Sequence, residues 1–143
     1  MINDVARAFF EAPAVRQVCV GLPDEDLTSS DRTADRVGHL KMSCYGTRDA
    51  AMNWQGEVAR VILKWGFTRG KYNPCLYWHK GWKVRVLVHG DDFVAVGEEE
   101  DVEWFRKLAV GWFEMKVRGK LGDGVKDEKE IGGGASIAHN PKN

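Results

Sequence analysis

The strongest constraint in this sequence is a pair of adjacent acids, Asp91 and Asp92, set between two apolar stretches. Valines alternate through residues 84–88 before the pair, and residues 93–96 are apolar after it. Gly90 and Asp91 have the glycine-first order that type II′ β-hairpin turns prefer. Two neighbouring carboxylates repel each other, and neither has a basic neighbour in the sequence. A divalent-cation site at the hairpin tip explains the pair, because metal ions reverse that penalty.

The composition is that of one soluble globular domain. The 143 residues are 43% hydrophobic and 29% charged, with a net charge of zero, which excludes a uniformly basic nucleic-acid coat protein. We find no signal peptide and no apolar run long enough to cross a membrane. Cys19, Cys44 and Cys75 are odd in number and widely spaced. They indicate reduced thiols in an intracellular protein, cytoplasmic or nuclear, rather than disulfides or a zinc knuckle.

Charge is unevenly distributed along the chain. Residues 58–90 contain basic and aromatic side chains and no acid, whereas residues 91–103 are strongly acidic. One interpretation is a surface that holds a phosphate backbone beside a metal site. The other is a solvated face with core aromatic residues, and composition alone favours this second interpretation.

Hydrophobic periodicity predicts an α+β fold, an antiparallel sheet with helices packed on one face. The strands expected in the first half cover residues 17–20 and 37–44, with a polar loop over residues 24–36 between them. The strands expected in the second half cover residues 75–79, 82–89 and 92–96.

Two helices are expected. The first begins near Thr47 or Asp49, ends near Gly66 and has an apolar stripe at Ala51, Trp54, Val58, Val61, Ile62 and Trp65. The second follows Glu98, with a stripe at Val102, Phe105, Ala109 and Trp112. Past Lys120 the pattern dissolves, and residues 122–143 are expected to be a flexible tail.

A third carboxylate is needed if the acid pair is to hold two cations, since each hard cation takes several oxygen ligands. Asp4 is the candidate. It lies among apolar residues (Ile2, Val5, Ala8 and Phe9), so we expect it at the end of a buried strand.

Five blocks of the sequence resemble motifs of copia-type retrotransposon reverse transcriptases, in the family's order. They are Asp-Val-Ala-Arg-Ala-Phe-Phe (residues 4–10), Leu-Lys-Met-Ser-Cys-Tyr-Gly-Thr-Arg-Asp-Ala-Ala-Met-Asn-Trp (40–54), the Gly-Phe…Asn-Pro-Cys-Leu-Tyr block (66–77), His-Gly-Asp-Asp (89–92) and Phe-Glu-Met-Lys (113–116). The resemblance covers residues 4 to about 121 and implies a palm-like region over residues 1–121.

The resemblance implies an RNA-directed DNA polymerase, in which Asp4, Asp91 and Asp92 bind two Mg²⁺ ions, with Mn²⁺ as a substitute. One ion activates the primer 3′-hydroxyl and the other neutralises the triphosphate. Because adjacent strand residues point to opposite faces, we expect Asp91 to be the closer ligand. Lys116 matches a candidate general acid for the leaving pyrophosphate. Its simpler interpretation is a surface lysine.

The same resemblance implies a nucleotide-binding set. Phe9 matches the aromatic gate that excludes a ribose 2′-hydroxyl, Tyr45 and Gly46 match a turn near the incoming nucleotide, and Arg48 stands where the family has lysine. The partners implied are deoxynucleoside triphosphates and an RNA or DNA template with primer. Without the family order, Phe9 and Tyr45 are equally well explained as core aromatics, and Arg48 as a solvated charge at a helix start.

Several positions depart from the family pattern. His89 and Gly90 replace Tyr-Val before the acids, and Asp49 replaces glutamine, which adds negative charge where phosphate is expected. By comparison with the family pattern, we expect the fingers, thumb, integrase and RNase H segments to be missing. The alternatives are therefore a catalytically inactive retroelement remnant with weak nucleic-acid binding, or an unrelated metal-binding α+β protein if Asp4 lies far from Asp91.

Overall fold

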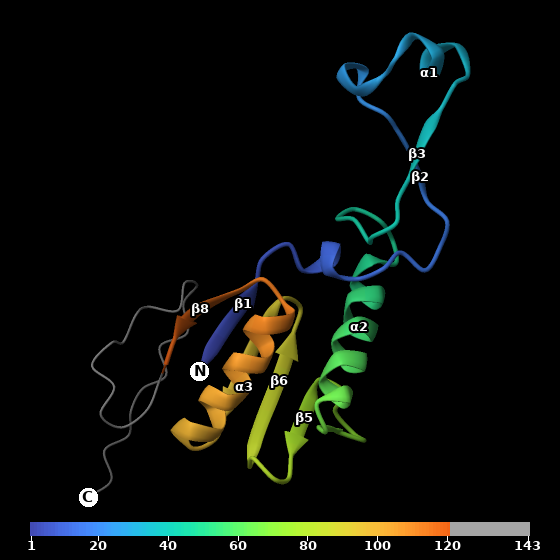
Figure 1. Ribbon diagram of the computed structural model, residues 1–143. Coiled ribbons are helices and arrows are strands. Elements are labelled where there is room, and N and C mark those ends of the chain that lie inside the picture. Colours follow the sequence, from blue (N-terminus) through green and yellow to red (C-terminus); the bar gives the residue numbers. More distant parts are fainter. Residues whose placement is uncertain (121–143) are drawn as a thin grey trace, which may run out of the picture. The chain divides into compact units, whose positions relative to one another are not determined.

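A computed structural model describes residues 1–120 of the chain (Figure 1). The described residues form two compact units. The sheet unit comprises residues 1–6 and 67–120, and the arm unit comprises residues 7–66. The expected tail, residues 122–143, lies outside the described residues.

The sheet unit is built on a six-stranded antiparallel sheet with the order β4-β5-β6-β7-β1-β8. Its strands are β1 (Ile2–Val5), β4 (Thr68–Arg69), β5 (Leu76–His79), β6 (Val84–His89), β7 (Asp92–Val96) and β8 (Met115–Gly119). Helix α3 (Glu99–Trp112) connects β7 to β8 and packs on β6 and β7 (Figure 1). The expected α+β class with an antiparallel sheet is confirmed.

Strand alternation divides the sheet into two faces. On the core face, Val5, Val86 and Phe93 are at most 1% exposed, and α3 buries Val102, Phe105 and Ala109. The expectation that Trp112 completes this stripe is wrong: it is the last residue of the helix and is 42% exposed. The chain turns to extended backbone at Phe113, which is buried in its place. The other face carries Asp4 and Asp92, and we call it the acidic face.

The hairpin between β6 and β7 has a two-residue turn. His89 pairs with Asp92, which leaves only Gly90 and Asp91 in the loop. Gly90 has φ +61°, and Asp91 is not among the residues with positive φ. A positive φ at the first loop position alone is the type II′ pattern, so the expected turn is confirmed.

The arm unit contains a long helix and a two-stranded ribbon. Its elements are η1 (Ala8–Glu11), β2 (Cys19–Gly21), η2 (Asp24–Asp26), α1 (Ser29–Thr33), β3 (Val37–His39) and α2 (Ala50–Lys64). The first expected helix is α2, which contacts η1 and ends at Lys64, with Trp65 as its C-cap residue and Gly66 after it at φ +88°. Its stripe is shifted from the expectation, because Ala50 is buried whereas Ala51 is exposed and Trp65 only half-buried.

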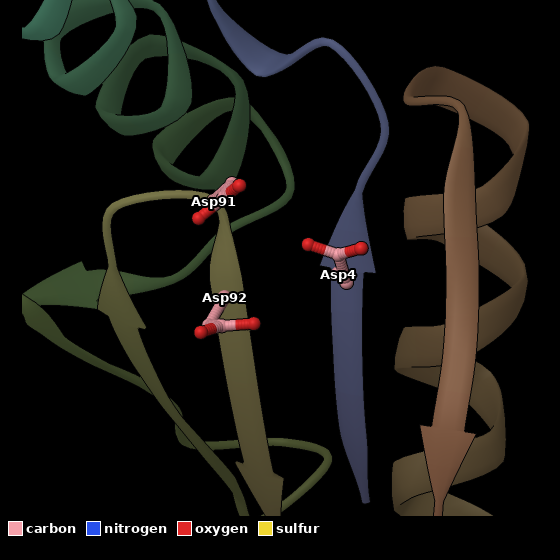
Figure 2. Close-up of side chains that lie close together, drawn as sticks. All are labelled: Asp4, Asp91 and Asp92. Atoms are coloured by element: carbon pink, nitrogen blue, oxygen red, sulfur yellow. The ribbon is translucent and has the colours of Figure 1, made fainter. Parts of the chain in front are cut away.

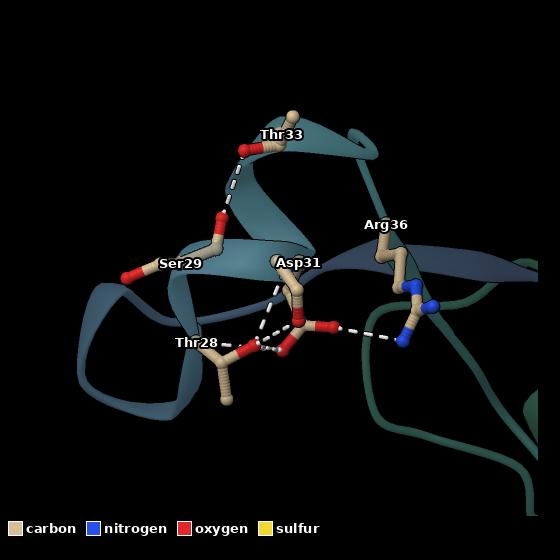
Figure 3. A network of polar contacts seen from close by, with 6 residues as sticks. Thr28, Ser29, Asp31, Thr33 and Arg36 are labelled. Carbon is tan, nitrogen blue, oxygen red and sulfur yellow. Dashed lines mark hydrogen bonds and ion pairs between the residues drawn. The ribbon is translucent and has the colours of Figure 1, made fainter.

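Two local expectations in the arm unit are wrong. The strand expected over residues 37–44 ends at His39, since only residues 37–39 pair with β2 before the chain enters a turn around Cys44. The expected loop over residues 24–36 contains the helix α1, and a capping box forms at the start of this helix (Figure 3). The Asp31 backbone N–H donates to the Thr28 hydroxyl at 3.2 Å, and the Asp31 carboxylate accepts from the Thr28 N–H at 3.0 Å. This reciprocal pair satisfies two free donors at the helix start.

No helix within residues 1–120 has both the length and the apolar character needed to span a membrane.

Candidate metal centre

Three carboxylates meet where strands β1 and β7 lie side by side, beside the β6–β7 turn (Figure 2). Asp4 lies in β1, Asp92 begins β7, and Asp91 occupies the turn before it. One oxygen atom from each lies within 4.8 Å of the others. Asp91 is exposed, whereas Asp4 and Asp92 are half-buried. We call these three residues the acidic cluster.

The sheet register explains why the cluster forms. Asp4 and Asp92 are directly paired residues of β1 and β7, and directly opposed residues of an antiparallel pair project to the same face. The Val5 backbone N–H donates to the Asp91 carbonyl at 2.9 Å, which fixes the turn to the end of β1. Asp91 lies in the turn, so strand alternation does not send its side chain to the core face. Both acids of the pair therefore reach the cluster.

The same register extends the cluster into a row of titratable side chains. His89 pairs with Asp92, Asp92 with Asp4, and Asp4 with Lys116. The four residues therefore share the acidic face across β6, β7, β1 and β8. Two of them, His89 and Lys116, are exposed. The row places the candidate general acid Lys116 directly across from Asp4.

Arg118 supplies a positive charge to the cluster that the sequence reasoning missed. Its Nη2 lies 3.0 Å from Oδ2 of Asp4, with side chains 47% and 18% exposed respectively. The hydrogen bond to Asp4 and its negative charge raise the pKa of Arg118, with smaller contributions from the charges of Asp92 and Asp91. The acids have no basic neighbour in sequence, but this one is close in space.

The register between β1 and β8 shifts beside Arg118. The pairing of β1 with β8 runs Asp4 to Lys116 and Asn3 to Val117, then shifts so that Ile2 faces Gly119. Arg118 lies at this shift, between the residues that face Asn3 and Ile2. Lys116 and Arg118 are two positions apart, a spacing typical of one strand face, which was the available signal.

Two of the expected nucleotide-binding residues contact each other in the arm unit. The rings of Phe9 and Tyr45 have centroids 4.4 Å apart and are tilted by 32°. Phe10 meets Tyr45 edge-on at 5.5 Å. Phe9 is half-buried and Tyr45 is half-exposed, so neither is an ordinary core aromatic.

The turn before α2 holds the other expected residues. Gly46 has φ +86°, and the Thr47 backbone N–H closes the turn on the Cys44 carbonyl at 3.1 Å. Thr47 therefore belongs to the turn, and Asp49 is the residue before the helix. Arg48 is exposed.

Asp49 is neutralised by a partner that the sequence did not reveal. Arg16 Nη2 lies 3.2 Å from Asp49 Oδ1. The hydrogen bond from Arg16 lowers the pKa of Asp49, and burial of the carboxylate opposes that shift. The negative charge at this departure from the family pattern is therefore paired within the arm unit.

The basic and aromatic segment, residues 58–90, is divided between the two units. Phe67 and Tyr77 are core residues, exposed by 4% and 3%, as the second interpretation expected. Trp78 and Trp82 are exposed by 45% and 41%. Each interpretation thus fits some of the aromatic residues.

The donor set of the acidic cluster suits a hard divalent cation. Mg²⁺ and Mn²⁺ prefer carboxylate oxygen ligands. The cluster provides three carboxylates, and two of them are on paired strands that hold them in place.

No protein-family model and no solved structure matches this chain.

Proposed function

We propose that this chain is the palm-like part of a copia-type reverse transcriptase, an RNA-directed DNA polymerase. One observation carries the proposal. Carboxylate oxygen atoms from two separate motifs, Asp4 and the pair Asp91–Asp92, lie within 4.8 Å of one another. Their chain order is also the order in which the resemblance places the metal-binding acids.

In this proposal Asp4, Asp91 and Asp92 hold two Mg²⁺ ions, which Mn²⁺ can replace. The bound ions supply activation of the primer 3′-hydroxyl and neutralisation of the triphosphate. Lys116, opposite Asp4 in the register, donates a proton to the leaving pyrophosphate.

The arm unit supplies nucleotide recognition in the same proposal. The Phe9 ring excludes a ribose 2′-hydroxyl, and its contact with Tyr45 holds it in position. The Tyr45–Gly46 turn packs near the incoming deoxynucleotide, and Arg48 meets phosphate or template. The partners are deoxynucleoside triphosphates and an RNA or DNA template with primer. Fingers and thumb segments hold the duplex.

Cation binding is the first test. Mn²⁺ binding is measured by calorimetry on the purified chain, with Asp91→Asn as the cluster variant. Asp26→Asn is the matched control, because Asp26 is an exposed carboxylate outside the cluster. The proposal expects binding by the chain and by the control, and at least about tenfold weaker binding by Asp91→Asn, since one of the three carboxylate ligands is lost.

Primer extension is the second test. The chain receives an RNA template, a DNA primer, deoxynucleotides and Mg²⁺. Extension that Asp91→Asn abolishes supports the polymerase. We expect weak extension from the purified chain, because positioning of primer and template supplies much of the rate. Absence of Mn²⁺ binding contradicts the proposal.

A second candidate is a retroelement remnant that binds nucleic acid weakly and does not polymerise. The Arg118–Asp4 ion pair favours it, because a guanidinium at 3.0 Å competes for a ligand that the polymerase needs. Mn²⁺ binding without extension at high protein concentration is the result that this candidate expects.

A further inference from the structure

The acidic cluster already contains a positive charge from the protein itself. Arg118 contacts Asp4 at 3.0 Å and comes from β8, the edge strand next to β1. The cluster gathers three carboxylates whose oxygen atoms lie within 4.8 Å of one another, and like charges at that distance repel unless a positive charge lies nearby. In the structure, the guanidinium of Arg118 provides part of that charge.

The geometry makes the pair reversible. The Arg118 side chain is 47% exposed, so it can move into solvent without leaving a buried cavity. Asp4 is only 18% exposed and is held by strands on both sides. A divalent ion that binds Asp4 meets the positive charge of Arg118 on the same carboxylate. Repulsion between the two positive charges at such a short distance favours occupation of Asp4 by one of them at a time.

We propose that Arg118 is a displaceable counter-ion, which occupies Asp4 when no divalent cation is bound and must leave when one binds. The inference rests on the metal site of the proposed function. Its consequence is that Arg118 weakens divalent-cation binding while it stabilises the cation-free chain.

Mn²⁺ binding to Arg118 variants tests the proposal, by calorimetry at neutral pH and moderate salt. Arg118→Leu removes the charge and should bind Mn²⁺ about three- to fivefold more tightly than the unmodified chain, the range of a partly exposed ion pair. Arg118→Lys keeps the charge and should bind like the unmodified chain. Arg118→Gln replaces the leucine variant if that variant fails to fold.

Arg85→Leu is the matched control. Arg85 is exposed in β6 and alternates with the buried valines of that strand, so it shares the acidic face with His89. It lies four positions before His89, about 13 Å along the strand, and its removal changes the net charge equally. Its variant should change Mn²⁺ affinity by less than about twofold, because salt screens charges at that distance.

A second measurement follows thermal unfolding with and without Mn²⁺. Cation-free Arg118→Leu should unfold at a lower temperature than the unmodified chain and gain more on Mn²⁺ addition.

The outcomes separate this inference from the proposed function. Equal Mn²⁺ affinity for the chain and Arg118→Leu overturns the counter-ion role while the metal site stands. An equal gain in Arg85→Leu also overturns it, because net charge then explains the effect. Absence of Mn²⁺ binding in every variant overturns both. If Arg118→Leu binds Mn²⁺ more tightly but the chain shows no primer extension, the counter-ion role of Arg118 is supported. That result counts only against the proposed polymerase activity.

Discussion

The two faces of the sheet unit differ in whether a polar side chain has a partner. Two neighbouring residues of β1, Asn3 and Asp4, show the difference. Asp4 is charged, but it lies on the acidic face with Arg118 3.0 Å away. Asn3 is neutral, but it is fully buried on the core face, and its side-chain nitrogen and oxygen have no hydrogen-bond partner among the described residues. The comparison teaches that the partner decides the cost of a polar group, more than its formal charge does.

Core packing is where the two faces should differ most. Phe93→Ala removes a side chain with 0% exposure from the core face, so we expect a loss of about 3–5 kcal/mol in unfolding free energy. Leu87→Ala, on the acidic face at 37% exposure, should cost about 1 kcal/mol or less. Urea unfolding of both variants measures the difference. Equal costs would mean that the two faces are packed alike.

Asn3 gives the next effect, with the opposite sign. Asn3→Val replaces an unpartnered buried amide with an apolar, β-branched side chain suited to a central strand. We expect about 1–3 kcal/mol of added stability in urea unfolding, the penalty of a buried unsatisfied polar group. Asn3→Asp is the matched opposite and should destabilise the chain, because it adds charge at the same position. A destabilising Asn3→Val would indicate that the amide has a partner such as an ordered water.

The turn that carries the acidic cluster gives a smaller effect. Gly90 has φ +61° and open space where a Cβ would lie, so Gly90→Ala meets backbone strain without a clash. We expect a loss of about 1–2 kcal/mol, because an L-residue is strained at this positive φ.

Gly56→Ala is the control for that prediction. Gly56 lies inside α2 without positive φ and with nothing near its Cβ position, so alanine should add about 0.5–1 kcal/mol. Both changes are read from urea midpoints. A harmless Gly90→Ala would contradict the type II′ turn.

The capping box of α1 contains a third kind of polar group for this comparison, the Asp31 carboxylate, whose partners are close in sequence (Figure 3). Hydrogen bonds from the Thr28 hydroxyl and backbone N–H, and one from Arg36, hold the pKa of Asp31 below its ordinary value of 3.8. Its stabilising effect is therefore present above about pH 3.8 and is lost as the pH falls through the lower folded value.

NMR-detected titration of the α1 amides measures that loss, which we expect to be the smallest of the four effects because the network is exposed. Thr28→Ala should bring the midpoint back toward 3.8. An unchanged midpoint in Thr28→Ala would show that the cap does not set the pKa.

Local patterns predicted the elements that local forces determine. The β6–β7 hairpin followed from alternating valines and a glycine-first turn, and α2 and α3 followed from helical periodicity. The short α1 was missed because its five residues bury no apolar stripe, although Thr28 and Asp31 carry its capping signal.

The candidate site was predictable only in part. The need for a third carboxylate among apolar residues indicated Asp4, the resemblance then matched it to a family motif, and the register explains why it meets the acid pair. Arg118 was missed because its contact with Asp4 depends on the pairing of β1 with β8, and the Lys116–Arg118 spacing alone does not indicate which strand lies alongside. The orphaned amide of Asn3 was missed for a related reason, since its burial depends on strands from the far end of the described chain.

The insertion of β1 between β7 and β8 also has a kinetic consequence. The sheet unit draws a central strand from one end of the described chain and its neighbours from the other, so closing it requires a large loop in the unfolded chain. Contacts of such high sequence separation form slowly. The acidic cluster cannot exist before that step, so a bound cation would act on the chain after its rate-limiting closure, slowing unfolding rather than accelerating folding.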